Sequence, residues 1–369
     1  MKILILEPFL AGSHASWANE YARLGSHETT VLGLEGRHWK WRMHGGAVTL
    51  ARLFLESTLE PDIILASDMC DLAAFLALTR ERTAGARAAV YFHENQLTYP
   101  WSERDPDPDA ARDAHYGFIN ITSALAAGAV LFNSRYHLES FCGALKTFLG
   151  AFPDNRETGA EDMIRAKSSV LPLGLDLGRL DALRPDSPRE GPPLVLWNHR
   201  WEYDKNPGEF FRALFELADG GLEFRVAVLG ERFREAPPVF DEAVRRLGDR
   251  IVRFGRVDDF GEYAGWLWKA DILPVTSIHD FFGASVVQAI YCNCCPLLPN
   301  RLAYPEHIPS GRHGEFLYEG FDDLLERLRE RIVTIGETRV LETQDFVKQY
   351  DWRVVAPRYD DILQRLFST

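Results

Sequence analysis

Short apolar runs alternate with longer amphipathic stretches along the first half of the chain. Each run is six or seven residues long, apolar nearly throughout and bounded by turn residues, as strands covered on both faces of a sheet are. The runs lie at residues 2–7, 29–34, 61–67, 88–93 and 128–134. The stretches with helical spacing lie at residues 14–24, 47–59, 71–82 and 111–127. Strands that alternate with helices predict βαβ units and a parallel sheet.

The second half repeats this alternation after one further strand, predicted at 167–176. Its strands are predicted at residues 194–197, 224–230, 250–255, 271–277 and 295–299. Helices are predicted to begin near 206, to end near 248, to cover 262–270 and to begin at 283. The fold class is therefore α/β, with two Rossmann-like domains in series, and two such domains with parallel sheets would face each other across a cleft.

The domain boundaries follow from composition. Residues 177–193 contain four Pro, two Gly and many charges without a sustained period, which is typical of an interdomain linker. This predicts an N-terminal Rossmann-like domain at 1–176 and a C-terminal Rossmann-like domain at 194–349. The final stretch, 350–369, is amphipathic and predicts a C-terminal helix, for which packing back on the N-terminal domain is one placement.

Composition narrows the class of protein. The length of 369 residues favours two cores, and the apolar fraction of 46% argues against disorder. Apolar runs stay shorter than the ~18 residues that a membrane span needs, and the N-terminus is interpreted as a first strand and not as a signal peptide. The net charge of −13 argues against broad, non-specific nucleic-acid binding but leaves room for a local basic patch.

The five cysteines do not form a plausible disulfide framework, because the count is odd and three of them crowd into residues 291–296. Cys292 and Cys295 make a single C-x-x-C with no second pair at zinc spacing. Buried thiols beside a strand explain them better than zinc does. We therefore expect a reducing, cytoplasmic setting.

Polar residues that directly follow predicted strands are the candidate ligand contacts, because ligands of open parallel sheets bind outside the carboxyl ends of the strands. Gly12, Ser13 and His14 stand at the first strand-to-helix turn. A glycine there lets a ligand approach the backbone, and a helix N-terminus favours anions or polar groups. A tight turn with Ser13 as helix cap would explain the same residues.

A second group follows the strand at 88–93. His93, Glu94, Asn95 and Gln96 place two ionisable groups and two amides behind an apolar strand. Such groups are costly to bury unless they contact a ligand. A solvated loop is the alternative interpretation.

In the second domain, Arg200 and Lys205 follow the strand at 194–197. A guanidinium offers a rigid fork of donors and an ammonium a compact charge, and together they suit a diphosphate. An ordinary salt-bridge cluster with Glu202 and Asp204 is the alternative.

A fourth group follows the strand at 271–277. Gly283, Ala284 and Ser285 begin a helix, whose free N–H groups and dipole would favour a phosphate. Asp280 and Gln288 stand eight residues apart around this helix start. We expect no metal ion, because no D-x-D follows these strands; those that occur, at 105–107 and 107–109, lie in a Pro-rich loop.

The stretch RHWKWRMH (37–44) is the candidate basic patch. Arg37, Lys40 and Arg42 alternate with Trp39 and Trp41 in a chain that is otherwise acidic. Aromatic faces stack on unpaired bases of RNA loops, and cations contact phosphates. A Trp-rich loop that packs on its own domain is the alternative.

Several of these segments carry a resemblance to a known family. They are AGSH (11–14), WKWR (39–42), YFHENQLTYP (91–100), YGFINITSALAA (116–127), VLFNSRYHLESF (130–141), FPDNR (152–156), HRWEYDKNP (199–207), VLGE (228–231) and HDFFGASVVQAIYCNCCPLLPNRLAYPE (279–306). The chain resembles retaining GT-B glycosyltransferases of the family-4 type, whose second domain carries an Arg and Lys pair and an E-x7-E motif. It is most similar to the tRNA-queuosine α-mannosyltransferases, and the resemblance covers nearly the whole length.

The resemblance implies a nucleotide-sugar donor, GDP-mannose, and queuosine in a tRNA anticodon loop as acceptor, without a cofactor or metal. It implies catalytic roles for His93, Arg200, Lys205 and Asp280. The implied donor-binding residues are Gly12, Arg200, Lys205, Gly230, Asp280, Phe282, Gly283, Ala284, Ser285 and Gln288. The expected acceptor-binding residues are Ser13, His14, Arg37, Trp39, Lys40, Trp41, Arg42, His93, Glu94, Asn95 and Gln96.

Two positions depart from the family pattern. Asp280 stands where the family has the first Glu, which contacts the sugar hydroxyls, and Gln288 stands where it has the second, which binds the ribose. Asp280 reaches one methylene less, and Gln288 offers a neutral hydrogen bond in place of a charged one, which is commonly weaker by about half. Donor preference or donor affinity is therefore expected to differ from that of the family.

Other functions remain open at this point. One is a GT-B glycosyltransferase with a glycan or lipid acceptor, although the chain carries no basic amphipathic surface helix. Another is a nucleotide-sugar-binding protein without transferase activity, and a third is a nucleotide-sugar epimerase. His93 is expected to contact the sugar or the acceptor, with a role as general base as the second possibility. The sequence does not determine the oligomeric state.

Overall fold

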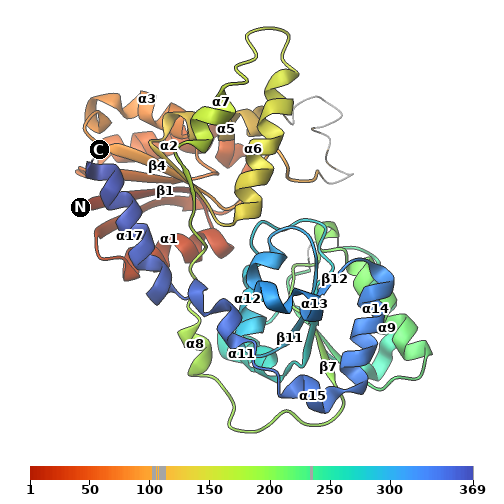
Figure 1. The fold of residues 1–369 in the computed structure, drawn as a ribbon. Coiled ribbons are helices and arrows are strands. Elements are labelled where there is room, and N and C mark those ends of the chain that lie inside the picture. The colour runs from red at the N-terminus through yellow and green to blue at the C-terminus, as the bar shows by residue number, and fades with distance from the viewer. Residues whose placement is uncertain (102–104, 106, 108–113, 233–235, 369) are drawn as a thin grey trace. The chain divides into compact units, whose positions relative to one another are not determined.

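The computed structural model describes residues 1–101, 105, 107, 114–232 and 236–368. The chain divides into two compact units (Figure 1). Unit 1 comprises Met1–Gly174 and Trp352–Thr369, and unit 2 comprises Leu175–Asp351. The backbone thus passes from one unit to the other at 174–175 and again at 351–352. Among the described residues, none of the helices combines the length and the apolar character needed to cross a membrane.

Unit 1 contains a parallel sheet of six strands in the order β2-β1-β3-β4-β5-β6. The strands are β1 (Lys2–Leu10), β2 (Glu28–Glu35), β3 (Ile63–Ser67), β4 (Arg87–Phe92), β5 (Ala129–Phe132) and β6 (Ser168–Val170). Its helices are α1 (Gly12–Leu24), α2 (Trp39–Glu56), α3 (Leu72–Thr83), α5 (Ala114–Ala126), α6 (Arg135–Gly150), α7 (Ala160–Arg165) and α17 (Trp352–Ser368).

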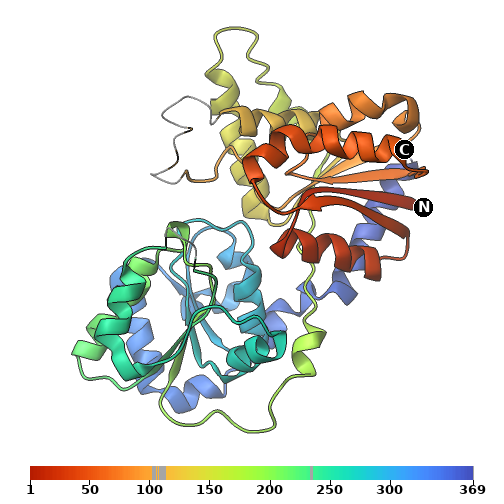
Figure 2. The same ribbon diagram turned by 180° about the vertical axis from the view of Figure 1, so that it is seen from behind.

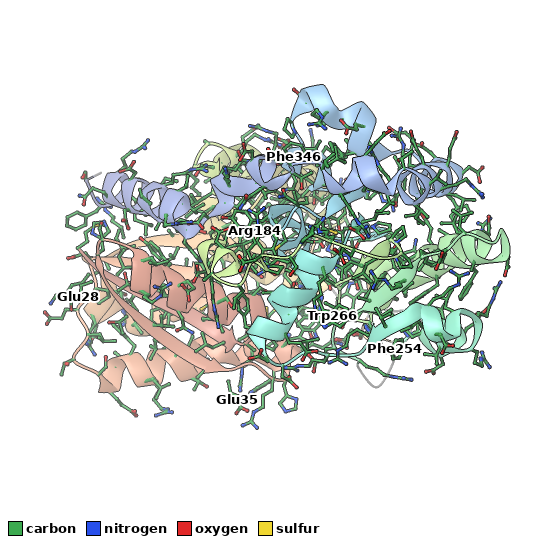
Figure 3. The ribbon with its side chains drawn as sticks, turned by 90° about the horizontal axis from the view of Figure 1, so that it is seen from below. Glu28, Glu35, Arg184, Phe254, Trp266 and Phe346 are labelled. Atoms are coloured by element: carbon green, nitrogen blue, oxygen red, sulfur yellow. The ribbon has the colours of Figure 1, made fainter. Side chains whose placement is uncertain are left out.

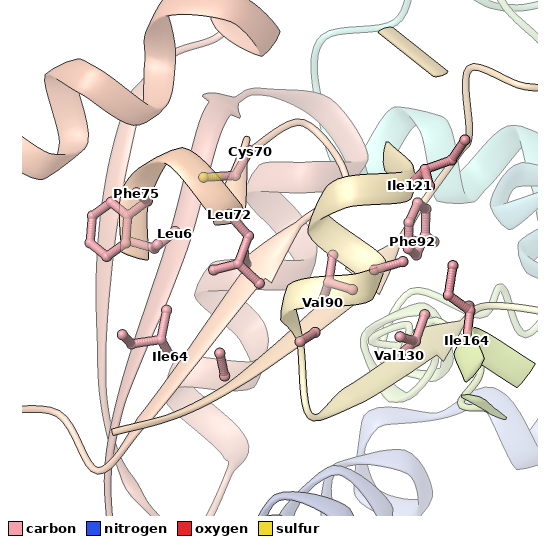
Figure 4. Packing of buried hydrophobic residues seen from close by; sticks show 14 of the residues in the cluster. Leu6, Ile64, Cys70, Leu72, Phe75, Val90, Phe92, Ile121, Val130 and Ile164 are labelled. Carbon is pink, nitrogen blue, oxygen red and sulfur yellow. The ribbon is translucent and has the colours of Figure 1, made fainter. Parts of the chain in front are cut away.

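The first core of unit 1 forms because its strands are apolar on both faces. Leu6, Ile64 and Val90 from neighbouring strands pack with Leu72 and Phe75 of α3 (Figure 4). Complete burial of each large apolar side chain stabilises the folded state by about 1.5–3 kcal/mol. This core fixes the strand ends from which the candidate site residues extend.

The C-terminal helix belongs to unit 1 and lies beside α1 in both ribbon views (Figures 1 and 2). The indole N–H of Trp17 donates a hydrogen bond to the Tyr359 hydroxyl at 3.2 Å. The Tyr21 hydroxyl donates to Asp360 at 2.9 Å. The last residues of the chain therefore complete the packing around the first helix.

Unit 2 repeats the architecture with a sheet in the order β12-β11-β10-β7-β8-β9. Its strands are β7 (Leu194–Trp197), β8 (Arg225–Val228), β9 (Ile251–Phe254), β10 (Ile272–Pro274), β11 (Cys295–Pro299) and β12 (Leu317–Tyr318). Its helices are α8 (Gly178–Asp181), α9 (Pro207–Asp219), α10 (Val239–Leu247), α11 (Phe260–Lys269), α12 (Ala284–Tyr291), α13 (His313–Phe316), α14 (Phe321–Val333), α15 (Ile335–Arg339) and α16 (Gln344–Val347). Two six-stranded parallel sheets confirm the predicted α/β class.

Some boundaries differ from the prediction. The strand predicted at 167–176 is only three residues long, and Leu175, farther along the predicted segment, instead forms an isolated bridge with Asp351. The segment 177–193 lies within unit 2, where the indole N–H of Trp268 donates to the Leu180 carbonyl and the guanidinium of Arg189 donates to the carbonyls of Trp268 and Cys292. Strand β12 and helix α14 were not predicted from the sequence.

Candidate active site

Three polar side chains of unit 1 lie at the carboxyl ends of neighbouring strands. Asp68 directly follows β3, His93 directly follows β4, and His14 lies in the first turn of α1 after β1. The strand order reverses between β1 and β3. Doubly wound sheets bind ligands at such a switch point. The fold thus brings His14 and His93, which are far apart in sequence, to the place where a ligand is expected.

Direct contacts join these residues into one cluster. The Nδ1 atom of His14 lies 2.9 Å from a carboxylate oxygen of the fully buried Glu7. The His93 backbone N–H donates a hydrogen bond to Asp68 at 2.7 Å. The rings of His14 and His93 are in contact, with centroids 4.2 Å apart.

The charges of this cluster follow from burial and proximity. Burial alone would lower the pKa of His14, but the charge of Glu7 and the hydrogen bond to it raise the pKa to about 9. Burial raises the pKa of Asp68 to about 8, although the charge of His14 opposes this shift. Burial, then the charges of His14 and His137, hold the pKa of His93 well below its usual value. These shifts favour the protonated forms of His14 and Asp68 and the neutral form of His93.

The same cluster is the candidate metal centre in the described part of the chain. One ligand atom from each of Glu7, His14 and His93 lies within 4.8 Å of the others. A metal ion requires deprotonated ligands. The Glu7 carboxylate and the His14 imidazolium already neutralise each other, so a cation would have to displace the proton that the pair holds.

Helix α1 does not begin with the Ser13 cap that was the alternative interpretation of this turn. Its N-cap is Ala11 and has no side-chain capping bond, so Ser13 is an exposed first-turn residue and not the cap. Gly12 has φ of 53°, and no atom lies within 4 Å of where a Cβ would stand. The turn therefore requires a glycine for its backbone conformation and leaves open space above it.

The remaining residues of the loop after β4 are buried or half-buried and are not a solvated loop. Asn95 is fully buried, and its side-chain oxygen accepts hydrogen bonds from the backbone N–H groups of Leu97 and Thr98. Gln96 donates to Glu94 at 3.1 Å. Asn95 thus shapes the loop, whereas Glu94 and Gln96 are held as a pair beside His93.

The basic stretch at 37–44 is largely helical and not a loop, because α2 begins at Trp39, eight residues earlier than predicted. The positive charge of Lys40 is neutralised by two carboxylates, because its ammonium group contacts Asp105 at 2.6 Å and Asp107 at 2.5 Å. Trp39 packs against the rings of Trp101 and Tyr116. Lys40 and Trp39 are therefore committed to contacts within unit 1.

The other three predicted RNA contacts in this stretch, Arg37, Trp41 and Arg42, face solvent to different degrees. Trp41 is 65% exposed. Arg37 pairs with Glu35, which is labelled in Figure 3, at 3.1 Å, and Arg42 donates to the Glu35 carbonyl. Both guanidinium groups retain donors for a phosphate, since each uses only part of its fork in these contacts.

In unit 2, the strand order reverses between β10 and β7; the predicted diphosphate pair, Arg200 and Lys205, follows β7, and Asp280 follows β10. The buried ammonium of Lys205 lies 3.1 Å from Asp204 and 3.1 Å from Asp280, and it donates to the His279 carbonyl at 3.0 Å. Lys205 stands on the 3-10 turn Tyr203–Lys205, which leads into α9. This is a buried cation with two carboxylates at the switch point.

The three charges stabilise one another. Burial would lower the pKa of Lys205, but Asp280 and Asp204 raise it. Burial would raise the pKa of Asp280, but Lys205 and then His199 lower it to about 2. The Tyr304 hydroxyl also donates to Asp280 at 3.2 Å. Asp280 is thus held ionised and in a fixed orientation.

Arg200 has a different environment from Lys205. Its side chain is 53% exposed and contacts Glu202 at 3.1 Å. The structure therefore supplies both components of the predicted pair, but with one cation enclosed and the other at the surface.

Helix α12 begins beside these charges. Gly283 is its N-cap with φ of 83°, and Ala284 and Ser285 form its first turn. The Asn198 amide donates to the Ser285 carbonyl at 2.7 Å, which ties this turn to the end of β7. Gln288 accepts a hydrogen bond from the Tyr263 hydroxyl at 2.9 Å. The side-chain oxygen of Gln288 therefore accepts this hydrogen bond, and the side-chain NH₂ group remains able to donate one.

Two further predicted donor residues lie in the same region of unit 2. Gly230 follows β8 with φ of 109°, and a Cβ there would stand 2.0 Å from the His199 carbonyl oxygen. Only glycine fits this close approach. Phe282 is buried, and its carbonyl contacts the His307 ring at 2.5 Å.

Sequence reasoning missed several members of both clusters. Glu7 and Asp68 in unit 1, and Tyr263 and Tyr304 in unit 2, were not singled out. Asp68 could have been found, since it directly follows a predicted strand. Glu7 and the two tyrosines gave no signal, because their contacts depend on how distant elements pack.

Solved structures with the same fold define the class. The chain is similar over 100% of its length, and over 100% of the other chain, to HepE of Anabaena in complex with UDP, with a TM-score of 0.66 at 16% identity. It is similar to the same extent to sucrose-phosphate synthase of Thermosynechococcus elongatus, with a TM-score of 0.70 at 12% identity. Two Rossmann-like units with these strand orders give the chain the GT-B fold of glycosyltransferases.

The family follows from sequence. Residues 2–175 match the model of the N-terminal region of tRNA-queuosine α-mannosyltransferases. The chain is 31% identical over 376 aligned positions to the tRNA-queuosine α-mannosyltransferase of Drosophila melanogaster, covering 98% of this chain and 96% of that one. The protein belongs to the tRNA-queuosine α-mannosyltransferase family.

Proposed function

We propose that this protein transfers mannose from GDP-mannose to queuosine in the anticodon loop of a tRNA, with retention of configuration at the sugar carbon. The observation that carries the proposal is the full-length match to the Drosophila enzyme of that name. The buried Lys205 at the switch point of unit 2 supports a phosphate-bearing donor. A cytoplasmic setting suits the proposal, since all five cysteines are free and buried.

Unit 2 is assigned the donor. When the sugar leaves, negative charge builds on the β-phosphate of the nucleotide. Lys205, Arg200 and the first turn of α12 would stabilise that charge, as fixed donors and cations do where charge develops. Asp280 would accept hydrogen bonds from the sugar hydroxyls. The carbon that is attacked passes through an oxocarbenium-like state.

Unit 1 is assigned the acceptor. His14 and His93, at the switch point, and the half-buried pair Glu94 and Gln96 would contact hydroxyl groups of the acceptor or the sugar. Arg37, Trp41 and Arg42 would contact the RNA. His93 is neutral at working pH, so it would accept or donate a hydrogen bond without carrying charge.

The test is a transfer assay with a choice of substrates. The protein is incubated with GDP-mannose, UDP-glucose or UDP-galactose and with tRNA that contains or lacks queuosine, and the nucleosides are then analysed by mass spectrometry. We expect a hexose on queuosine with GDP-mannose only. Transfer to a glycan or lipid, nucleotide-sugar binding without transfer, or release of an epimerised sugar would each replace the proposal by another function.

Metal independence gives a second prediction. Because Lys205, Arg200 and a helix start supply the positive charge at the donor phosphates, transfer is expected to be unchanged within twofold after EDTA treatment or Mg²⁺ addition. The rate is measured at saturating donor in metal-free buffer. A loss of tenfold or more that is restored by a divalent ion would contradict this assignment.

The RNA assignment gives a third prediction. Replacing Arg37 and Arg42 together by Ala is expected to weaken tRNA binding and to flatten the slope of log K against log salt by about 1–2, because up to two phosphate contacts are lost. Arg52→Ala is the matched control, since Arg52 is exposed on α2, the helix that also carries Arg42, and pairs with Glu56. Donor binding should stay unchanged. An equal slope in the double variant and the wild type would remove this surface from the RNA interface.

A further inference from the structure

His199 is a buried histidine in the turn after β7, directly before Arg200. Two contacts fix its backbone. Its carbonyl oxygen accepts a hydrogen bond from the indole N–H of Trp197 at 2.9 Å, and Gly230 approaches the same oxygen so closely that no side chain fits there. The residue is therefore held in one position by the protein itself.

The two ring nitrogens of His199 have different surroundings. Nδ1 lies 3.4 Å from the hydroxyl oxygen of Ser285, in the first turn of α12. Within the part of the chain that the structure describes, Nε2 is buried without a hydrogen-bond partner. Buried polar atoms are nearly always paired, so an unpaired one indicates that a ligand or a water completes the site. One nitrogen of His199 thus stands beside a protein group, and the other is available to a ligand.

The groups around the ring favour an anion as that ligand. The ring lies within electrostatic reach of Lys205 and Asp280, the buried pair at the switch point of unit 2. It also stands beside the start of α12, where backbone N–H groups and the positive end of the helix dipole favour negative charge. The Asn198 amide fixes this helix start by donating to the Ser285 carbonyl at 2.7 Å. A cation, a helix start and an unpaired ring nitrogen therefore gather in one place.

We propose that His199 is a donor-binding residue: the Ser285 hydroxyl donates a hydrogen bond to Nδ1, and the proton that this tautomer carries on Nε2 is donated to the phosphate that bears the sugar. The inference rests on the proposed function for the presence of a nucleoside-diphosphate sugar. It gives a role to a side chain that is neither part of the Arg200 and Lys205 pair nor part of the helix start.

The position of the ring indicates which phosphate it contacts. Asp280 is assigned to the sugar hydroxyls and the start of α12 to the phosphates, and the ring of His199 is close to both. The phosphate bonded to the sugar is the donor group that lies next to both. Its oxygens only accept hydrogen bonds, so they match an N–H and would be repelled by an unprotonated nitrogen. Burial, and then the charge of Lys205, lower the pKa of His199 to about 4, which leaves the ring neutral with a single N–H.

The test compares nucleotides that differ by this phosphate. Binding of GDP and of GMP to the full-length protein is measured by calorimetry for the wild type, His199→Met and His199→Gln. Methionine is a similar size but has no N–H donor, whereas glutamine can place a side-chain NH₂ near the position of Nε2. In His199→Met we expect GDP binding to weaken by about ten- to a hundredfold, as the loss of one hydrogen bond to a charged group does, and GMP binding to stay unchanged. His199→Gln should recover most of the GDP affinity.

The matched control is His313→Met, the same change at another histidine of unit 2. Nε2 of His313 lies 3.2 and 3.0 Å from the carbonyl oxygens of Pro305 and Ile308, so this nitrogen is not available to a ligand. His313→Met should bind both nucleotides as the wild type does. The thermal midpoints of all three variants are measured together with binding, so that a loss of fold is separated from a loss of contact.

The tautomer is checked by a second measurement. Histidine is labelled with ¹⁵N in the full-length protein, and the signals of His199 are identified by their absence in His199→Gln. In the complex with GDP we expect the proton on Nε2 and none on Nδ1, because the Ser285 hydroxyl donates to Nδ1. A proton on Nδ1 in that complex would overturn the assignment.

Other outcomes also decide the question. Equal weakening of GDP and GMP binding in His199→Met would mean that His199 only supports the fold, and unchanged GDP binding in that variant would exclude the contact. If the wild type prefers UDP, the same comparison is made with UDP and UMP; GDP-mannose is then wrong as the donor, but the role of His199 is still decided. A wild type that binds neither diphosphate overturns the inference. If no sugar reaches queuosine although the GDP-specific loss is found, the proposed function fails and the inference is confirmed.

Discussion

Replacing Lys205 by Met is expected to lower kcat/KM for transfer by at least a hundredfold. Lys205 is the cation that the fold buries at the switch point of unit 2, between Asp204 and Asp280. A preorganised group that meets developing charge in an enclosed site is worth about 2.7–4 kcal/mol in mutational studies, which corresponds to ~10²–10³ in rate. The loss should appear in kcat more than in KM, because the additional negative charge on the leaving phosphate develops only as the bond breaks.

Stability must be separated from catalysis in this variant. Removing one partner of a buried ion pair leaves the other charges unpaired and costs about 3–5 kcal/mol. The thermal midpoint of Lys205→Met is therefore measured together with its rate, and a second variant, Lys205→Met with Asp204→Asn, removes one of the stranded charges. We expect the double variant to recover stability but not activity. Recovery of both would mean that Lys205 is structural.

The matched control is Lys269→Met. Lys269 is an exposed lysine of unit 2 at the end of α11, where its ammonium lies 5.4 Å from the centroid of the Trp266 ring. This variant removes the same charge and keeps the same side-chain volume, so it should retain wild-type kcat/KM. A wild-type rate in Lys205→Met would remove the diphosphate assignment.

The strands could be predicted from sequence because parallel strands buried on both faces are apolar nearly throughout. This rule predicted β7 correctly, since its predicted and observed bounds coincide at 194–197. It failed for β6, which is only the three residues Ser168–Val170 of the predicted segment 167–176; farther along that segment, Leu175 forms an isolated bridge with Asp351 instead of extending the strand. Apolar sequence predicts burial, but only hydrogen-bonded neighbours make a strand.

Placement after a strand also predicted where polar residues would gather, and the two switch points explain why. His14 and His93 come together because β1 and β4 lie on either side of β3 in one sheet. The state of these residues was not predictable in the same way. The charge of His14 depends on Glu7, whose side chain the sequence pattern treats as one polar position inside a strand.

The basic stretch shows the same limit more clearly. Its composition suggested three available cations, yet Lys40 is neutralised by Asp105 and Asp107, which are 65 and 67 positions away in sequence. Charge counted along the chain says nothing about partners brought in by folding. A surface for RNA must therefore be judged from Arg37, Trp41 and Arg42 alone.

The two departures from the family motif acquire a physical context in unit 2. Asp280 is short, but Lys205 and the Tyr304 hydroxyl both contact it. Gln288 receives a hydrogen bond from Tyr263, so its amide is oriented to donate where a carboxylate would accept. A ribose hydroxyl can serve either partner. If Gln288 contacts the ribose as the resemblance implies, the substitution would change the direction of the hydrogen bond that the helix offers, and not only its strength.

The largest effect on stability is expected from Asp271→Ala in unit 2. Asp271 is fully buried between the first residues of β7 and β10, and the guanidinium of Arg339 donates to its two oxygens at 2.9 and 3.0 Å. The Leu194 backbone N–H donates to it as well, at 2.9 Å. Removing the carboxylate leaves a cation and an N–H group without their acceptor, so we expect a loss of about 3–5 kcal/mol in the free energy of unfolding.

The control for this prediction is an ion pair of the same type at the surface. Arg232 and Asp241 also form a two-point contact, at 3.0 Å each, but their side chains are 51% and 60% exposed. Exposed pairs contribute about 0–1 kcal/mol because water and salt screen them. Urea unfolding of both variants, followed by tryptophan fluorescence, compares the two. Asp271 joins the start of β7 to the start of β10, and Lys205 and Asp280 follow the opposite ends of these two strands. If the urea midpoint of Asp271→Ala shifts no more than that of Asp241→Ala, the switch point of unit 2 is held together by apolar packing alone.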